Sequence, residues 1–239
     1  MPHTRFNLKE AADYLHVSEG DLSLLVKRSE VPHQMVANRP VFVRGELDVW
    51  ASQRLLGFAQ RNLEDYHRRS SAKMHDLSRH SAIVSELLKP AWIEPELNAR
   101  TKSSVLRDMI DRADATGLLN DRAGLLHSMI EREKLCSTAL SGGVAILHGQ
   151  HHEPYQSEDS FLVLGRTIQP IPFGAPDGKS TDIFFLMCCQ DNRIHLHVLA
   201  RICMLCHQTP LLGNLRECAT ADDMHAAILT QELETIRGL

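Results

Sequence analysis

A single histidine follows a short apolar run in the segment Gly-Gly-Val-Ala-Ile-Leu-His-Gly, which spans residues 142–149. The four apolar residues predict a buried strand, and the flanking glycines predict open turns at its ends. The histidine, His148, therefore stands where a strand delivers an imidazole into a turn. A neutral imidazole offers one nitrogen lone pair, so this arrangement suits a phosphoryl acceptor.

Two other segments carry groups that would assist such chemistry. Arg132 precedes the strand, and His195 opens the stretch His-Leu-His-Val-Leu far downstream. Phosphoryl transfer passes through a highly charged transition state, so the protein must mainly position groups and stabilise anionic oxygens. Arg132 offers a fork of donors, although a structural salt bridge is an equal alternative. His195 can donate to phosphoryl oxygens from a helix N-terminus, where N–H groups favour anions. His197 is expected to face away and to be structural.

The composition describes an ordinary globular protein. The chain has 239 residues, of which 43% are hydrophobic and 23% charged, with a net charge of −4. This length allows one large domain or two modest ones. The negative charge argues against a protein that coats nucleic acid or anionic membrane along its whole length. No apolar run approaches the roughly 18 residues of a membrane span, and the N-terminus lacks a signal-peptide core. We therefore expect a cytoplasmic protein without membrane insertion.

The cysteines and the clustered histidines are candidate metal ligands. The six cysteines are scattered, and free buried thiols are expected. Cys203 and Cys206 have zinc-knuckle spacing, but they fall inside an apolar helical pattern that predicts a core face. His148, His151 and His152 could share an ion, but no carboxylate or thiolate with matching geometry lies nearby. We therefore expect no metal and no cofactor.

Residues 1–58 predict a compact helical module. Asn7 and Glu10 form a capping box for a first helix, and Ser18 caps a second. A hairpin is expected within residues 31–43, and a third helix from residue 44. Two helices separated by a short break and followed by a small β wing are the layout of a winged helix-turn-helix.

The segments 8–18 and 42–50 resemble the opening and the ending of excisionase- and MerR-type DNA-binding domains. The resemblance implies that the second helix and the wing contact DNA, through four basic residues: Lys27, Arg28, Arg39 and Arg44. Residues 1–60 carry seven basic and seven acidic side chains, so such a module would bind DNA weakly and need a dimer or a second contact. The alternative is a solvated face on a protein-docking module.

The rest of the chain predicts a linker and an α/β domain. Residues 59–82 are polar and mildly basic, which indicates a linker or an exposed helix. From residue 83 onward, helices are expected after Thr101 and Asp121, and buried strands at 144–147, 161–168 and 182–189. Helices at 196–206, after Pro210 and after Thr220 complete the pattern. We expect residues 83–239 to form a small mixed sheet flanked by helices.

This C-terminal domain resembles the enzyme IIA domains of the phosphoenolpyruvate-dependent sugar phosphotransferase system, of the fructose/mannitol type and its nitrogen-regulatory branch. The resemblance covers about 150 residues and rests on 105–106, 117–121, 132–133, 137–138 and 143–146. It implies that His148 takes a phosphoryl group from a histidine-containing phosphocarrier protein, beside His195 and Arg132. The family usually has proline immediately before the acceptor, where this chain has Leu147; without proline the turn is less rigid.

The sequence therefore favours a regulatory protein: a helix-turn-helix module joined to a nitrogen-regulatory enzyme IIA domain that is phosphorylated on His148. Phosphorylation would change its association with a target protein or its binding to DNA. One alternative is a DNA-binding transcriptional regulator whose enzyme IIA-like domain is a degenerate, unphosphorylated sensor. Another is a metal-responsive protein built on His148, His151 and His152.

Overall fold

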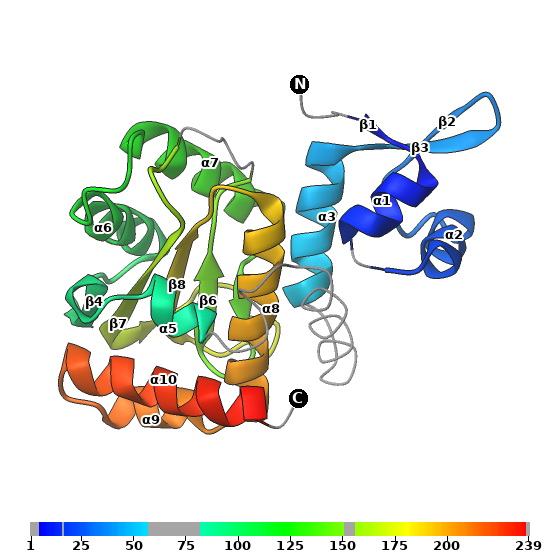
Figure 1. Cartoon of the computed structure of the whole chain (residues 1–239). Helices are drawn as coiled ribbons and strands as arrows, with labels where there is room; N and C mark the ends of the chain where they lie inside the picture. The colour runs from blue at the N-terminus through cyan, green and yellow to red at the C-terminus, as the bar shows by residue number, and fades with distance from the viewer. Residues whose placement is uncertain (1–4, 16, 57–81, 151–155, 238–239) are drawn as a thin grey trace.

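The computed structural model describes residues 5–15, 17–56, 82–150 and 156–237. These residues form an N-terminal module of three helices with a small sheet, and a C-terminal domain of helices around a larger sheet (Figure 1). The predicted linker at 59–82 lies outside the described residues except for Ala82. Among the described helices, none is both long and apolar enough to cross a membrane.

The N-terminal module contains the predicted helices and hairpin in the predicted order, together with a short strand at Arg5–Phe6 that the sequence did not predict. Its helices are α1 (Leu8–Leu15), α2 (Glu19–Lys27) and α3 (Arg44–Leu56), and its antiparallel sheet has the order β1 (Arg5–Phe6), β3 (Arg39–Val43), β2 (Gln34–Val36). Asn7 and Glu10 form the expected capping box, each backbone N–H donating to the other side chain at 2.8 and 3.0 Å. Ser18 caps α2 by accepting from the Asp21 N–H.

The C-terminal domain contains a mixed five-stranded sheet, in the order β4-β7-β8-β6-β5. The three predicted strands are β6 (Val144–Leu147), β7 (Phe161–Ile171) and β8 (Thr181–Cys188). β6 pairs parallel with β8, and β8 pairs antiparallel with β7. The edge strands β4 (Ile93–Leu97) and β5 (Ala139–Leu140) were not predicted. The expectation of a mixed sheet is confirmed.

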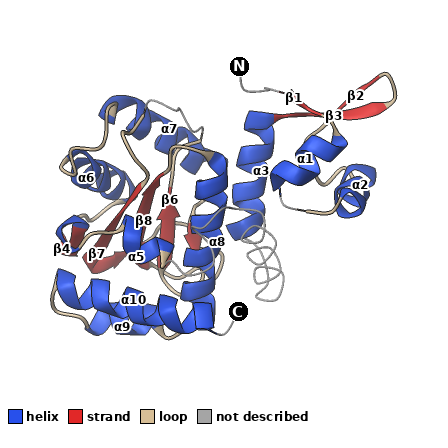
Figure 2. Cartoon of the chain, viewed as in Figure 1, coloured by secondary structure: helices blue, strands red, loops and turns tan. Residues whose placement is uncertain are grey.

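Helices cover both faces of this sheet (Figure 2). Helices α6 (Lys102–Asp114) and α7 (Arg122–Leu135) lie over one face, where they bury alternate side chains of the sheet such as Phe184. On the other face are α5 (Ile83–Leu87), α8 (Asn192–Gln208), α9 (Leu211–Glu217) and α10 (Ala221–Arg237), which bury neighbours such as Phe185. A 3-10 turn, η1 (Pro90–Trp92), precedes β4.

Most helices begin where the sequence predicts. The Thr101 hydroxyl accepts from the N–H of the third residue of α6, and the Asp121 side chain accepts from the Gly124 N–H of α7. Gly117 follows α6 with a φ of 74°, a left-handed conformation that glycine adopts without strain. The largest shift is in α8, which begins at Asn192, four residues before the predicted start, because Asp191 caps it.

Candidate functional site

His148 lies at the end of β6 with its ring orientation fixed by two hydrogen bonds. Its Nδ1 is 2.9 Å from the carbonyl oxygen of Ile146, which can only accept, so Nδ1 must carry the proton. Nε2 is then the nitrogen with the lone pair, and it accepts a 3.2 Å hydrogen bond from Nε of Arg132. The site thus holds a neutral imidazole with its nucleophilic nitrogen turned toward a guanidinium.

Arg132 reaches this nitrogen from the last turn of α7, and its side chain is completely buried. Its Nη1 donates to the Cys136 carbonyl at 2.9 Å, while Nη2 is buried without a hydrogen-bond partner among the described residues. Burial lowers the pKa of the guanidinium, and the neighbouring Glu133 carboxylate partly opposes that effect. A donor that has no protein acceptor is ready to bind an anionic oxygen.

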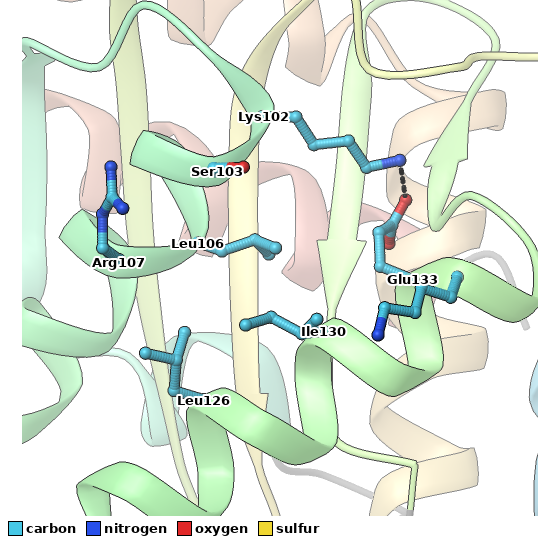
Figure 3. A pocket seen from close by; sticks show the side chains of 8 residues that line it. Lys102, Ser103, Leu106, Arg107, Leu126, Ile130 and Glu133 are labelled. Carbon is cyan, nitrogen blue, oxygen red and sulfur yellow. Dashed lines mark ion pairs between the residues drawn. The ribbon is translucent and has the colours of Figure 1, made fainter.

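Glu133, the residue after Arg132, stabilises this end of α7 through contacts with two other segments. The Glu133 carboxylate accepts from both the N–H and the hydroxyl of Thr138, and it pairs with Lys102 at 2.8 Å. Figure 3 shows this ion pair at the rim of a groove of about 600 Å³ between α6 and α7. The groove has an apolar floor that includes Leu106 and Ile130. It opens between these two helices, and neither His148 nor His195 is among its lining residues.

His195 approaches His148 from the first turn of α8. The two ring centroids are 5.0 Å apart with the rings inclined by 60°, and His195 is fully buried. Asp191 caps this helix, accepting from the N–H groups of Arg193 and Ile194 at 2.8 and 2.9 Å. The expectation that free N–H groups at this helix end would favour an anion is therefore wrong for these two donors, because a carboxylate already accepts from them.

Comparison with known proteins identifies this domain. Residues 86–231, more than half of the chain, match the family described as "Phosphoenolpyruvate-dependent sugar phosphotransferase system, EIIA 2". The chain belongs to this family. It is 30% identical over 147 residues to a nitrogen regulatory protein of Bradyrhizobium diazoefficiens, covering 61% of this chain and 94% of that protein. A second nitrogen regulatory protein, from Escherichia coli K12, is 26% identical over 154 residues, covering 62% and 91%.

Solved structures agree with the assignment to the EIIA family. The nitrogen regulatory protein IIA-Ntr of Neisseria meningitidis is 26% identical with a TM-score of 0.55, covering 61% of this chain and 99% of its own. The complex of enzyme IIAMTL and phosphorylated enzyme IIBMTL from Escherichia coli matches in fold, at 17% identity and a TM-score of 0.53, covering 60% and 99%. The C-terminal domain is thus an EIIA domain similar to nitrogen regulatory IIA-Ntr proteins.

Within this EIIA domain, the structure brings together all three residues that the sequence selected, His148, His195 and Arg132. The sequence alone did not identify Ile146, whose carbonyl oxygen orients the His148 imidazole. Its position two residues before His148 was the one sequence signal that could have indicated this hydrogen bond. Sequence reasoning also missed Ser52 of α3, whose hydroxyl lies 3.2 Å from Nε2 of His195. No local signal in the sequence could have identified that contact.

The residues considered as metal ligands divide into two groups. His151 and His152 lie outside the described residues. Cys203 and Cys206 are buried on α8, as the core prediction requires, and burial raises the pKa of both thiols, that of Cys206 to about 12. Among the described residues, no group of three or more histidine, cysteine or acidic side chains could hold a metal ion.

The four basic residues assigned to DNA contact fall in different environments. Lys27, Arg28 and Arg39 are exposed, at the end of α2 and the start of β3, and Arg28 lies 4.0 Å from Glu30. Arg44, at the start of α3, instead donates to the Tyr14 hydroxyl at 3.3 Å and lies over its ring. Three of the four are therefore exposed, and the fourth, Arg44, is half-buried against Tyr14.

Proposed function

We propose that this protein accepts a phosphoryl group on Nε2 of His148 from a histidine-containing phosphocarrier protein and acts as a regulator. The observation that carries the proposal is the 2.9 Å bond between His148 Nδ1 and the Ile146 carbonyl. This bond selects the tautomer in which Nε2 is nucleophilic, and it disperses the positive charge that the ring gains when Nε2 bonds to phosphorus.

In the transfer, the Nε2 lone pair of His148 gives up its hydrogen bond from Arg132 Nε and forms a bond to the phosphorus. The phosphorus–nitrogen bond of the donor phosphohistidine breaks at the same time, and its electron pair returns to the donor imidazole. Charge in this loose transition state is spread over the three phosphoryl oxygens. Arg132 is the residue to receive that charge, because Nη2 has no partner among the described residues and Nε already points at the nucleophile.

His195 and Leu147 support the same reaction. The His195 ring, 5.0 Å from His148 between centroids, is close enough for its Nε2 to meet a phosphoryl oxygen. Leu147 replaces the proline usual in the family, but it is buried and paired with Leu186 of β8. Strand register, together with the Ile146 and Arg132 hydrogen bonds, can therefore fix the acceptor turn without proline's restricted φ.

The regulatory part of the proposal rests on the similarity to nitrogen regulatory proteins and on the N-terminal module. In such a regulator, phosphorylation of His148 changes binding of a target protein, of DNA, or of both. For DNA, the supporting observation is that Lys27 and Arg28 at the end of α2 and Arg39 of the hairpin are all exposed. DNA binding is tested by a gel shift on genomic fragments at two salt concentrations, with the wild type, Arg28→Ala and the control Lys9→Ala on α1. We expect Arg28→Ala to bind more weakly than the other two proteins. Equal binding by all three would contradict DNA contact through Arg28.

The phosphoryl step is tested by labelling. The wild-type chain is incubated with phosphoenolpyruvate, the first enzyme of the system and its phosphocarrier protein, and acid-labile phosphate is measured. We expect label on the wild type and on His197→Ala, and none on His148→Ala. Equal label on His148→Ala would assign the acceptor elsewhere. The absence of label from every variant would favour the unphosphorylated sensor.

A further inference from the structure

Helix α3 of the N-terminal module contacts His195 of the EIIA domain. It runs beside α8 (Figure 1), and the Ser52 hydroxyl lies 3.2 Å from Nε2 of His195. Ser52 itself is only 4% exposed. This hydroxyl stands within hydrogen-bonding distance of the nitrogen that a phosphoryl oxygen would contact, so the serine occupies part of the acceptor site.

A second polar contact and a shared core hold α3 in this position. Asn192, the first residue of α8, donates to the Tyr14 hydroxyl, and that hydroxyl donates to Asp48 of α3 at 2.7 Å. Buried apolar residues of α1 and α3, among them Leu15 and Leu47, belong to the same continuous core as those of α8. The contact therefore combines directed hydrogen bonds with apolar packing, as a specific interface does.

The module also reaches the chain that follows the acceptor. Gln150, two residues beyond His148, lines a groove of about 530 Å³ together with Val49, Trp50 and Gln53 of α3. In this arrangement His148 is 2% exposed and His195 is fully buried. Reaction needs the donor phosphorus about 3–3.5 Å from Nε2 of His148, so a donor protein cannot reach it in this closed arrangement, in which α3 contacts the neighbouring His195.

We propose that α3 is an intramolecular lid on the phosphoryl-acceptor face, so that the N-terminal module and the phosphoryl donor protein compete for one surface. The inference rests on the proposed function of His148 and adds its regulation. Phosphorylation and lid closure then exclude each other. A phosphoryl group on His148 places negative charge and bulk next to His195, the residue that Ser52 of α3 contacts, and releases the module.

The lid sets the apparent affinity for the donor. Only the fraction of molecules with the module displaced can bind the donor, so its apparent dissociation constant rises in inverse proportion to that fraction. By the same linkage, phosphorylated protein presents the α3 face of the module, with Asp48 and Ser52, to other partners.

The test uses the full chain and two independent readouts. Ser52→Arg inserts a bulky charge into the α3–α8 contact, and Ser23→Arg makes the same change on α2, away from α8 (Figure 1). Tyr14→Phe removes the hydroxyl that joins Asn192 to Asp48 and serves as a milder opening variant. The first readout is carbethoxylation of histidines by diethyl pyrocarbonate, mapped by mass spectrometry; the second is the initial rate of phosphorylation at a low donor concentration.

We expect His148 and His195 to react slowly in the wild type relative to the exposed His127. Ser52→Arg should accelerate both carbethoxylation of these residues and phosphorylation by about tenfold or more, because it raises the open fraction. Tyr14→Phe should give a smaller acceleration in the same direction, and Ser23→Arg should match the wild type.

Either of two results would overturn the lid: His148 of the wild type reacting as fast as His127, or unchanged rates in both Ser52→Arg and Tyr14→Phe. Failure of the proposed function looks different, because it would leave every variant unphosphorylated while carbethoxylation still reported the lid. Phosphorylation of the wild type, Ser52→Arg and Tyr14→Phe at equal rates would support His148 as the acceptor and contradict the lid.

Discussion

Replacing Arg132 with methionine should separate catalysis from stability. The guanidinium donates to His148 and to the Cys136 carbonyl, and its third nitrogen has no partner among the described residues. Burial lowers its pKa, which means that the folded protein holds this cation at a cost in free energy. A methionine of similar length fills much of the same space without a charge.

The expected magnitudes follow from these contacts. The variant loses two hydrogen bonds from a charged donor, each contributing about 1.5–3 kcal/mol. It also escapes the desolvation penalty of a buried cation, which is several kcal/mol, so the free energy of unfolding should change by no more than about 2 kcal/mol. Phosphoryl transfer should fall by roughly 10²–10³-fold, about 2.7–4 kcal/mol, because a donor to the developing charge is gone.

Arg201→Met is the matched control, because among the described residues Arg201 is the other fully buried arginine. Its Nη1 lies 3.4 Å from the buried Glu232 carboxylate. Removing one partner of a buried ion pair costs about 3–5 kcal/mol, so this variant should be destabilised while its transfer rate stays near that of the wild type. Urea denaturation followed by circular dichroism gives the stabilities, and initial labelling rates give transfer. If Arg132→Met lost as much stability as Arg201→Met and kept wild-type transfer, Arg132 would be structural.

Two further predictions concern local structure. Gly143→Ala should cost about 1–3 kcal/mol, since φ is 85° and an added Cβ would lie 2.6 Å from Nη2 of Arg216. Gly117→Ala, with a φ of 74° but nothing within 4 Å, should cost only about 1 kcal/mol; equal melting temperatures for the two variants would refute the steric argument. Asp121→Ala should lower the free energy of unfolding by about 1 kcal/mol, because it removes the side chain that accepts from the Gly124 N–H at the start of α7. An unchanged urea midpoint would show that this cap contributes nothing to stability.

Local signals accounted for much of the fold. Caps act within three or four residues, so Asn7, Thr101 and Asp121 marked their helices in the sequence itself. The continuous apolar runs predicted β6, β7 and β8, because strands buried on both faces lack alternation. β4 gave no such signal, since it is an edge strand with the sequence Ile-Glu-Pro-Glu-Leu.

The sequence predicted the site residues that belong to the family pattern, but not those that only tertiary packing brings to the site. His148, Arg132 and His195 were selected by type and order along the chain. The contact between Ser52 and His195 joins residues 143 positions apart, and nothing in the sequence around α3 indicates what that helix covers. The helix-turn-helix function of the module remains a prediction from its resemblance alone.

The most direct test of the account is the position of the phosphoryl group on the intact chain. Wild-type protein and Ser52→Arg are incubated with phosphoenolpyruvate, the first enzyme and the phosphocarrier protein. Peptide mapping by mass spectrometry and ³¹P–¹⁵N nuclear magnetic resonance then locate the phosphorus. The account predicts a single acid-labile phosphate bonded to Nε2 of His148, formed faster in Ser52→Arg. Phosphate on Nδ1 of His148 or on His195, or none on either protein, would contradict it.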